Sequence, residues 1–193
     1  MTNYSVTSDL TKQLMADSLK KLMEAKSLTR ISVREIVEDC HLNRQTFYYH
    51  FQDIYALLEW IIKKEAISLL EKQDSWTSWQ DCVVEVLEYL KRNEKVCLNA
   101  YQTVSRELLK RFIYTDIFEL IRSGVDLHYE KNRATKTQRN FLAHFYTIGL
   151  SGVIEHWLIG GMKESPETLV RHFTAIIEGG IPGILSRFEA DSQ

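Results

Sequence analysis

Apolar residues recur at helical spacing along most of the chain, and this periodicity restricts the fold more than any other feature. The segment 9–27, for example, places six apolar residues on one helical face: Leu10, Leu14, Met15, Leu19, Leu22 and Met23. Only 8 Gly and 2 Pro occur in 193 residues, so few positions can break a helix. Strand-like alternation is nowhere sustained. The sequence therefore predicts an all-α protein.

The stretch SVREIVEDCHLNRQTFYYHF, from Ser32 to Phe51, predicts two short helices separated by a turn at Cys40-His41-Leu42. Ser32 and Glu35 have the spacing of a capping box, which starts the first of these helices. Asn43 is a favourable N-cap for the second. Two short helices joined by a turn of about three to four residues form a helix-turn-helix.

Phe47 and Phe51 lie four residues apart on the second helix, so both can pack inward. That packing turns polar side chains toward other faces: Arg44, Gln45, Thr46, Tyr48 and Tyr49. Arginine can bond guanine through two hydrogen bonds, glutamine can read adenine, and a threonine methyl can contact thymine. Tyrosine hydroxyls, His50 and the amides of a helix N-terminus can hold phosphates. For any single residue a plain polar helix surface is the simpler interpretation, but the whole set favours nucleic-acid binding.

Asp53 is a candidate N-cap for a fourth helix that runs from Ile54 to Leu70. This helix would join the N-terminal three-helix segment (the head) to the rest of the chain (the body) without a linker. Further helices are predicted at 78–92, 94–104, 106–131, 136–159 and 166–188. Glycines could break the third of these near Gly124 and the last at Gly179–Gly183. We predict a helix-turn-helix domain at residues 1–52 and a helical regulatory and dimerisation domain at 53–193.

Composition and motifs exclude several classes of protein. The net charge is −2, and the sequence has no basic tail of the kind that binds nucleic acid. The three cysteines, Cys40, Cys82 and Cys97, are odd in number and widely spaced, so a disulfide framework is not expected. The polar N-terminus lacks a signal sequence, and no apolar run is long enough to span a membrane. We therefore expect reduced thiols and a cytoplasmic location.

No combination of residues indicates catalysis or a metal site. Phosphate-binding glycine loops and an H-E-x-x-H motif are missing from the sequence. The pair Cys40-His41 could be half of a metal site, but turn and packing roles are the simpler interpretation. Cys97 with His128 could be imagined as nucleophile and base, yet a buried inert thiol explains Cys97 better. We expect no enzymatic activity, no metal and no cofactor.

The run NRQTFYYHF resembles the recognition helix of the TetR/AcrR family of transcriptional regulators, whose pattern ends in T-[LF]-Y-x-H-F. The resemblance covers residues 9–60 and departs at Ile54, where the family often has a lysine that reaches a phosphate. It implies base contacts from four side chains: Arg34, Arg44, Gln45 and Thr46. It implies contacts with the DNA backbone from Tyr48, Tyr49 and His50, with Ser32 and Asn43 at the capped helix starts.

The family resemblance also implies that the last two long helices build a four-helix bundle between two copies of the chain. The run FLAHFYTIGLSGVIEHWLIGG is apolar on more than one face, as a helix with both a core and a partner would be. Gly149 and Gly152 could allow close helix approach. A central core helix in a monomer is the alternative. A homodimer would present two recognition helices about 34 Å apart to a palindromic operator.

Regulators of this family typically bind a small molecule in a cavity of the C-terminal domain. Six aromatic residues are candidates for lining its cavity: Tyr101, Phe112, Tyr114, Phe118, Phe145 and Trp157. Each could instead be ordinary core. The run RQTFYYHFQDIYALLEW is also similar to a branch of the family that includes activators of dihydroxyacetone kinase operons, in which a partner protein is thought to switch the regulator. Control by a partner protein, or a helical interaction module, therefore stays open beside control by a small molecule.

Overall fold

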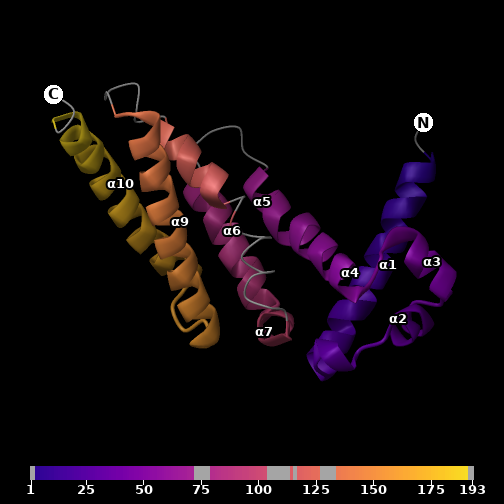
Figure 1. The fold of residues 1–193 in the computed structure, drawn as a ribbon. Helices are drawn as coiled ribbons and strands as arrows, with labels where there is room; N and C mark the ends of the chain where they lie inside the picture. Colours follow the sequence, from indigo (N-terminus) through magenta and orange to yellow (C-terminus); the bar gives the residue numbers. More distant parts are fainter. Residues whose placement is uncertain (1–2, 72–78, 104–113, 115–116, 127–133, 191–193) are drawn as a thin grey trace. The chain divides into compact units, whose positions relative to one another are not determined.

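The computed structural model of the protein describes residues 3–71, 79–103, 114, 117–126 and 134–190 (Figure 1). Regular secondary structure in these ranges is helical throughout, which confirms the predicted all-α class. None of the helices in the described ranges is both long and apolar enough to cross a membrane. The chain divides into two compact units. The first unit comprises Met1–Ala66 and Asn93–Leu109, and the second comprises Ile67–Arg92 and Lys110–Gln193.

The first unit contains the predicted helix-turn-helix and its supports. Its helices, in chain order, are α1 (Asn3–Ala25), η1 (Leu28–Arg30), α2 (Val33–Asp39), α3 (Arg44–His50), α4 (Ile54–Ile61) and α7 (Glu94–Thr103). α1 packs against α2, α4 and α7, and α2 packs against α3. The core buries apolar side chains from all five α-helices: Met15, Leu19, Ile36, Val37, Phe47, Phe51, Leu57, Leu58, Val96 and Ala100. The predicted three-helix head with an apolar fourth helix is therefore confirmed.

α7 joins this unit although about forty residues of chain separate it from the head. Its Val96 and Ala100 lie in the same core as Phe47. The predicted functional boundary between residues 52 and 53 stays a prediction, because a compact packing unit need not coincide with a functional domain.

A single amide side chain ties α7 to the end of α1. Asn99 Nδ2 donates hydrogen bonds to the carbonyl oxygens of Met23 and Lys26, both at 2.7 Å. Asn99 Oδ1 accepts from the Leu28 amide at 3.0 Å and from the Thr103 hydroxyl at 3.3 Å. The last carbonyls of a helix lack donors from their own helix, so Asn99 supplies what the end of α1 needs. All four hydrogen-bonding positions of its amide are occupied.

The predicted fourth helix continues past α4, although its geometry changes. Helical residues run without interruption from Ile54 to Glu71, through the π-helical η2 (Ile62–Ile67) and α5 (Ser68–Glu71). Glu65 of η2 accepts the Lys20 ammonium of α1 at 2.7 Å and the Gln13 amide at 3.3 Å. The Lys20 and Glu65 side chains are only 20% and 16% exposed, so solvent screens their attraction less than it screens a surface pair. This ion pair fixes the π-helical segment to α1.

The second unit contains the long C-terminal helices. Its described elements are α5, α6 (Trp79–Arg92), a helix at 117–126, α9 (Lys136–Ile159) and α10 (Pro166–Ala190). α10 packs against both α6 and α9. The core draws on all four longer helices: Trp79, Leu87, Ile121, Val125, Leu142, Ala143, Tyr146, Trp157, Phe173, Ile177, Ile181 and Leu185.

Neither glycine position at which a helix could break interrupts a helix in the described residues. Gly124 lies inside the helix at 117–126, and α10 runs unbroken through Gly179–Gly183. Pro182 removes one backbone donor, but Ile177, Ile181 and Leu185 of the same helix are almost fully buried, and their combined burial outweighs the cost of the proline. Gly180 has a packing role, because a Cβ there would lie 2.3 Å from the Tyr146 hydroxyl oxygen. Most of the predicted helix at 106–131 lies outside the described residues.

We expect Asn99→Ala to lower the free energy of unfolding of the first unit by roughly 1–3 kcal/mol, because it leaves two carbonyls and one amide at the end of α1 without partners. Urea denaturation would measure the loss, and faster hydrogen exchange at the end of α1 would locate it. Gln102→Ala removes an exposed amide from the same helix and is the matched control, with an expected change within about 0.5 kcal/mol. Equal effects of the two variants would contradict the role given to Asn99.

Candidate nucleic-acid interface

α2 and α3 are joined by a tight turn at residues 40–43. His41 has a positive φ of 54°, and the Leu42 amide donates to the Val37 carbonyl oxygen at 2.8 Å. The Cys40 thiol donates to the Ile36 carbonyl oxygen at 3.0 Å. The predicted break is confirmed, and both Cys40 and His41 take part in it.

Polar side chains cap the helices on either side of this turn. The Ser32 hydroxyl accepts the Glu35 amide at 3.3 Å, while the Glu35 carboxylate accepts the Ser32 amide at 3.0 Å, which completes a capping box. Asn43 Oδ1 accepts the Thr46 amide at 2.8 Å, and Asp53 caps α4 in the same way. The three predicted N-caps are confirmed. The side-chain oxygens of Ser32 and Asn43 are therefore engaged inside the protein.

The burial of two phenylalanines sets the rotation of α3. Phe47 is fully buried and Phe51 is 6% exposed, as the four-residue spacing predicted. Tyr48 and Tyr49 are 58% and 76% exposed. α3 thus presents four exposed polar or aromatic side chains: Arg44, Gln45, Tyr48 and Tyr49.

Thr46 and His50 are half-buried, and both have partners within the protein. The Thr46 hydroxyl contacts Asn43 Oδ1 at 3.1 Å. The His50 ring lies edge-on to the Tyr49 ring, with centroids 4.9 Å apart. Partial burial lowers the pKa of His50, and the positive charge of Lys12 on α1 adds to this effect. His50 is therefore biased toward the neutral imidazole.

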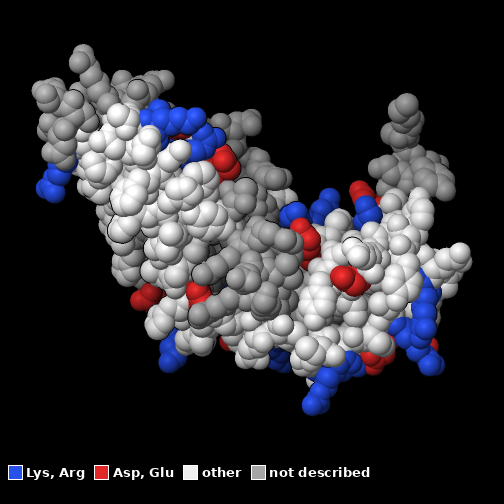
Figure 2. Space-filling view, viewed as in Figure 1, with Lys and Arg blue, Asp and Glu red and all other residues white. Residues whose placement is uncertain are grey.

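Charged side chains surround α2. Each acid of this helix is paired with a base: Glu35 with Lys26, Glu38 with Arg34, and Asp39 with Lys21. Figure 2 shows basic side chains along the edge of the first unit that α2 and α3 form. The sequence identified Arg34 as a candidate but missed its partner, although the four-residue spacing to Glu38 was a visible signal.

The six candidate ligand residues are spread over the structure. Tyr101 lies on α7 in the first unit, and Phe112 lies outside the described residues. Tyr114, Phe118 and His144 stack in the second unit, where the Tyr114 hydroxyl and His144 Nδ1 are 2.6 Å apart. Phe145 is 62% exposed, whereas Trp157 is buried and donates to the Glu164 carbonyl oxygen at 3.0 Å. Their role in ligand binding stays a prediction.

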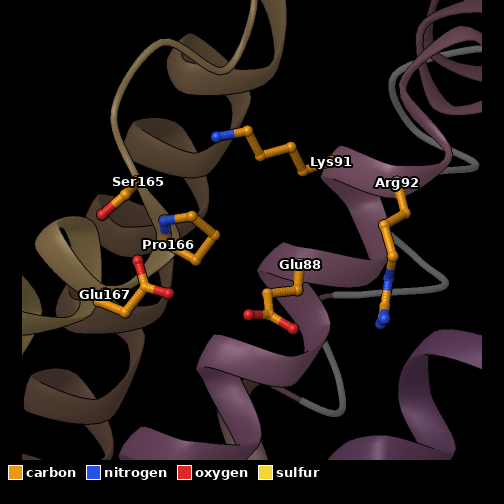
Figure 3. A pocket seen from close by; sticks show the side chains of 6 residues that line it. All are labelled: Glu88, Lys91, Arg92, Ser165, Pro166 and Glu167. Atoms are coloured by element: carbon orange, nitrogen blue, oxygen red, sulfur yellow. The ribbon is translucent and has the colours of Figure 1, made fainter.

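A hollow in the second unit lies between the end of α6 and the start of α10 (Figure 3). Its lining is mostly charged or polar: Glu88, Lys91, Arg92, Ser165, Pro166 and Glu167. The Ser165 hydroxyl, helped by the charge of Lys91, lowers the pKa of Glu167. None of the six candidate ligand residues lines this hollow.

Two family models match the chain. Residues 77–179 match the model described as the transcriptional regulator C-terminal region. Residues 17–61, which contain the helix-turn-helix, match the model for bacterial regulatory proteins of the tetR family.

A relative matches part of the chain. The HTH-type dhaKLM operon transcriptional activator DhaS of Lactococcus lactis subsp. lactis (strain IL1403) is 32% identical over 87 residues. The match covers 45% of this chain and 46% of that protein, so it spans about half the length of the relative.

Two solved structures have a similar fold. The dihydroxyacetone kinase operon activator DhaS has a TM-score of 0.74 at 22% identity, with 89% of this chain and 96% of that chain covered. Native NalD, the secondary repressor of the MexAB-OprM multidrug efflux pump in Pseudomonas aeruginosa, has a TM-score of 0.56 at 16% identity, with 89% and 97% covered. At these identities the two structures support the fold alone.

We expect Glu35→Gln to lower the free energy of unfolding of the first unit at neutral pH, and we expect the difference from wild type to shrink in acid. The Lys26 ammonium and the Ser32 groups lower the pKa of Glu35 from 4.5 to about 2. A carboxyl whose pKa is lowered by folding stabilises the protein above its ordinary pKa, and this contribution is lost as the pH falls through the folded pKa. Urea denaturation from about pH 7 to about pH 2 would follow the change. Glu24→Gln, which removes an exposed charge from α1, is the matched control for the loss of a surface charge. A difference between Glu35→Gln and wild type that stays constant with pH would contradict the assignment.

Proposed function

Because this chain belongs to the tetR family of bacterial regulatory proteins, we propose that it is a sequence-specific DNA-binding transcriptional regulator that acts as a homodimer on a palindromic operator. The exposed side chains of α3 above the buried Phe47 are the observation that carries this proposal. A regulator of this kind works where the DNA lies, which for a bacterial protein is the cytoplasm. The proposed functional domains are residues 1–52 for DNA binding and residues 53–193 for dimerisation and control.

The candidate contact residues divide into two proposed roles. Arg44 and Gln45 of α3, Arg34 of α2 and the methyl group of Thr46 read base edges in the major groove. Tyr48, Tyr49 and His50 contact phosphates, and these contacts set the register of the protein on the duplex. Ser32 and Asn43, whose side chains cap helices, contribute mainly by ordering the amides at the helix starts.

An exposed apolar stripe on α9 supports the homodimer. Phe141, Phe145 and Ile148 are 63%, 62% and 63% exposed and recur at helical spacing. Gly152 continues this stripe, and a Cβ added at Gly149 or Gly152 would meet nothing within 4 Å. The opposite face of α9 lies in the core of the second unit, so the helix is apolar on both faces. A second copy of the chain would remove the exposed stripe from water. The proposed homodimer has two copies of α3, the number that a palindromic operator requires.

We propose that the body controls the head by a shift between conformations. A ligand that binds one conformation better would change the spacing of the two recognition helices and so the affinity for the operator. Tyr101, Phe112, Tyr114, Phe118, Phe145 and Trp157 are the proposed contacts for a small-molecule effector. A second candidate, in which a partner protein replaces the small molecule, follows from the resemblance of residues 44–60 to the branch that includes activators of dihydroxyacetone kinase operons, and the relative from Lactococcus lactis is named as such an operon activator.

Selection of duplexes from a random library by the purified protein tests the proposed function directly. The expected result is a set of palindromic sequences whose binding weakens steeply with added salt. Failure to enrich any sequence above background would overturn the proposal.

We expect Tyr48→Phe to weaken binding by roughly three- to tenfold on all duplexes, because it removes a hydroxyl that contacts phosphate. Arg44→Ala and Gln45→Ala should weaken binding too, but each should in addition reduce the discrimination between bases at a particular base pair by about 1–3 kcal/mol. Competition binding with singly substituted operators would measure both effects, and Gln102→Ala on α7 is the matched control for Gln45→Ala. Equal, sequence-independent losses for Tyr48, Arg44 and Gln45 variants would show the division of roles to be wrong.

We expect Ile148→Glu to dissociate the dimer, because it places a charge in the middle of the exposed stripe on α9. Sedimentation velocity would report the change from dimer to monomer. Leu10→Glu adds the same charge at an equally exposed position of α1, 61% against 63%, and should leave the dimer intact. A dimer that withstands Ile148→Glu would contradict the proposed interface.

A further inference from the structure

One exposed ion pair lies within a helix of the proposed interface. Arg34 Nε donates to Glu38 Oε1 at 2.6 Å, one turn further along α2. Their side chains are 65% and 59% exposed, so both remain accessible to a macromolecule. In the described part of the chain no hydrogen bond engages the two terminal nitrogens of Arg34.

The other two acids of α2 have a different role from Glu38. Glu35 caps the helix and binds Lys26, while Asp39 binds Lys21 of α1. Both therefore connect α2 to residues outside the helix. Among the described residues the carboxylate of Glu38 binds Arg34 of its own helix and connects α2 to no other element. Its position is better explained by what it does to Arg34 than by the fold.

We propose that Glu38 is a positioning residue that holds the Arg34 guanidinium in the orientation needed to read a guanine. This inference rests on the proposed function and names a residue outside the contact set given above. The guanidinium is a rigid plane with five N–H donors. With Nε held by Glu38, the two terminal nitrogens are left to donate to guanine O6 and N7, the bidentate arrangement that distinguishes guanine in the major groove.

The negative charge of Glu38 also favours binding to the operator over binding to unrelated DNA. A carboxylate near the DNA is repelled by phosphates, so it weakens binding to every sequence. It also partly neutralises Arg34, which reduces the attraction of that side chain to phosphates on unrelated DNA. On a cognate site the bidentate bonds to guanine compensate for the repulsion. The ion pair itself is exposed and contributes little to the stability of the fold. Glu38 should therefore lower non-specific affinity more than specific affinity.

Binding to the selected operator and to an unrelated duplex of equal length would test the inference, with wild type, Glu38→Ala and Glu38→Gln compared. Replacing each operator guanine by 7-deazaguanine, which lacks N7, identifies the guanine whose substitution weakens wild type but not Arg34→Ala. We expect Glu38→Ala to reduce the preference for that guanine over 7-deazaguanine by about three- to tenfold. The same variant should bind the unrelated duplex about two- to fivefold more tightly than wild type does. Glu38→Gln keeps an oxygen acceptor for Nε and should retain most of the guanine preference while it also gains non-specific affinity.

Two controls separate positioning from charge and from folding. Glu24→Ala removes an exposed charge from α1 and should leave the guanine preference unchanged. In an Arg34→Ala background, Glu38→Ala should have no further effect on that preference, because its partner is gone.

The outcomes distinguish the inference from the proposed function. If an operator is selected but no guanine depends on Arg34, or if Glu38→Ala leaves the guanine preference intact, the role of Glu38 is overturned and the proposed function stands. Equal loss of guanine preference in Glu38→Ala and Glu38→Gln also overturns positioning through Nε, because charge alone would then explain the effect. If no duplex is selected, both fail.

Discussion

The burial of Phe47 is the constraint on which the exposed surface of α3, the proposed DNA-recognition surface, depends. α3 has only seven residues, too few to be stable as an isolated helix, so it exists because Asn43 caps it and Phe47 anchors it. Successive residues of an α-helix point about 100° apart. Once Phe47 is fully buried, Tyr48 and Tyr49 are directed to solvent, and a side chain one turn away, Phe51, is directed into the core. The same contact thus stabilises the helix and selects which side chains can meet DNA.

Charge pairing organises the neighbouring helix. Two of the acids of α2 bind bases outside it, and these pairs fix α2 to its surroundings. The third, Glu38, binds Arg34 within the helix and is the one exposed acid of α2 whose contact concerns a predicted DNA-reading side chain. Surface ion pairs of similar geometry can therefore differ in effect: a pair between elements fixes the position of a helix, whereas a pair within a helix restrains only the side chain of its partner.

The first unit is assembled from segments that are distant in the chain. Asn99 of α7 completes the hydrogen bonds at the end of α1, and Glu65 of the π-helical segment binds Lys20. Both contacts reach α1, the helix against which α2 and α4 also pack. A change in α7 or in the π-helical segment would therefore reach the helix that supports the helix-turn-helix, and this gives the proposed control of DNA binding a physical basis.

The sequence by itself determined those features that depend on residues within about one helical turn of each other. The capping box at Ser32, the N-caps Asn43 and Asp53, and the inward positions of Phe47 and Phe51 all follow from such spacings, and the all-α class follows from the periodicity of the whole chain. Only the tertiary structure decided which helices pack together, so the place of α7 in the first unit and the four bonds of Asn99 could not be read from local patterns. It also decided that α10 continues through Pro182, since the helix-breaking tendency of proline is local while the buried stripe that opposes it depends on α6 and α9. Local hydrogen bonds and side-chain spacing are encoded among neighbours, whereas burial depends on partners that the chain brings together only when it folds.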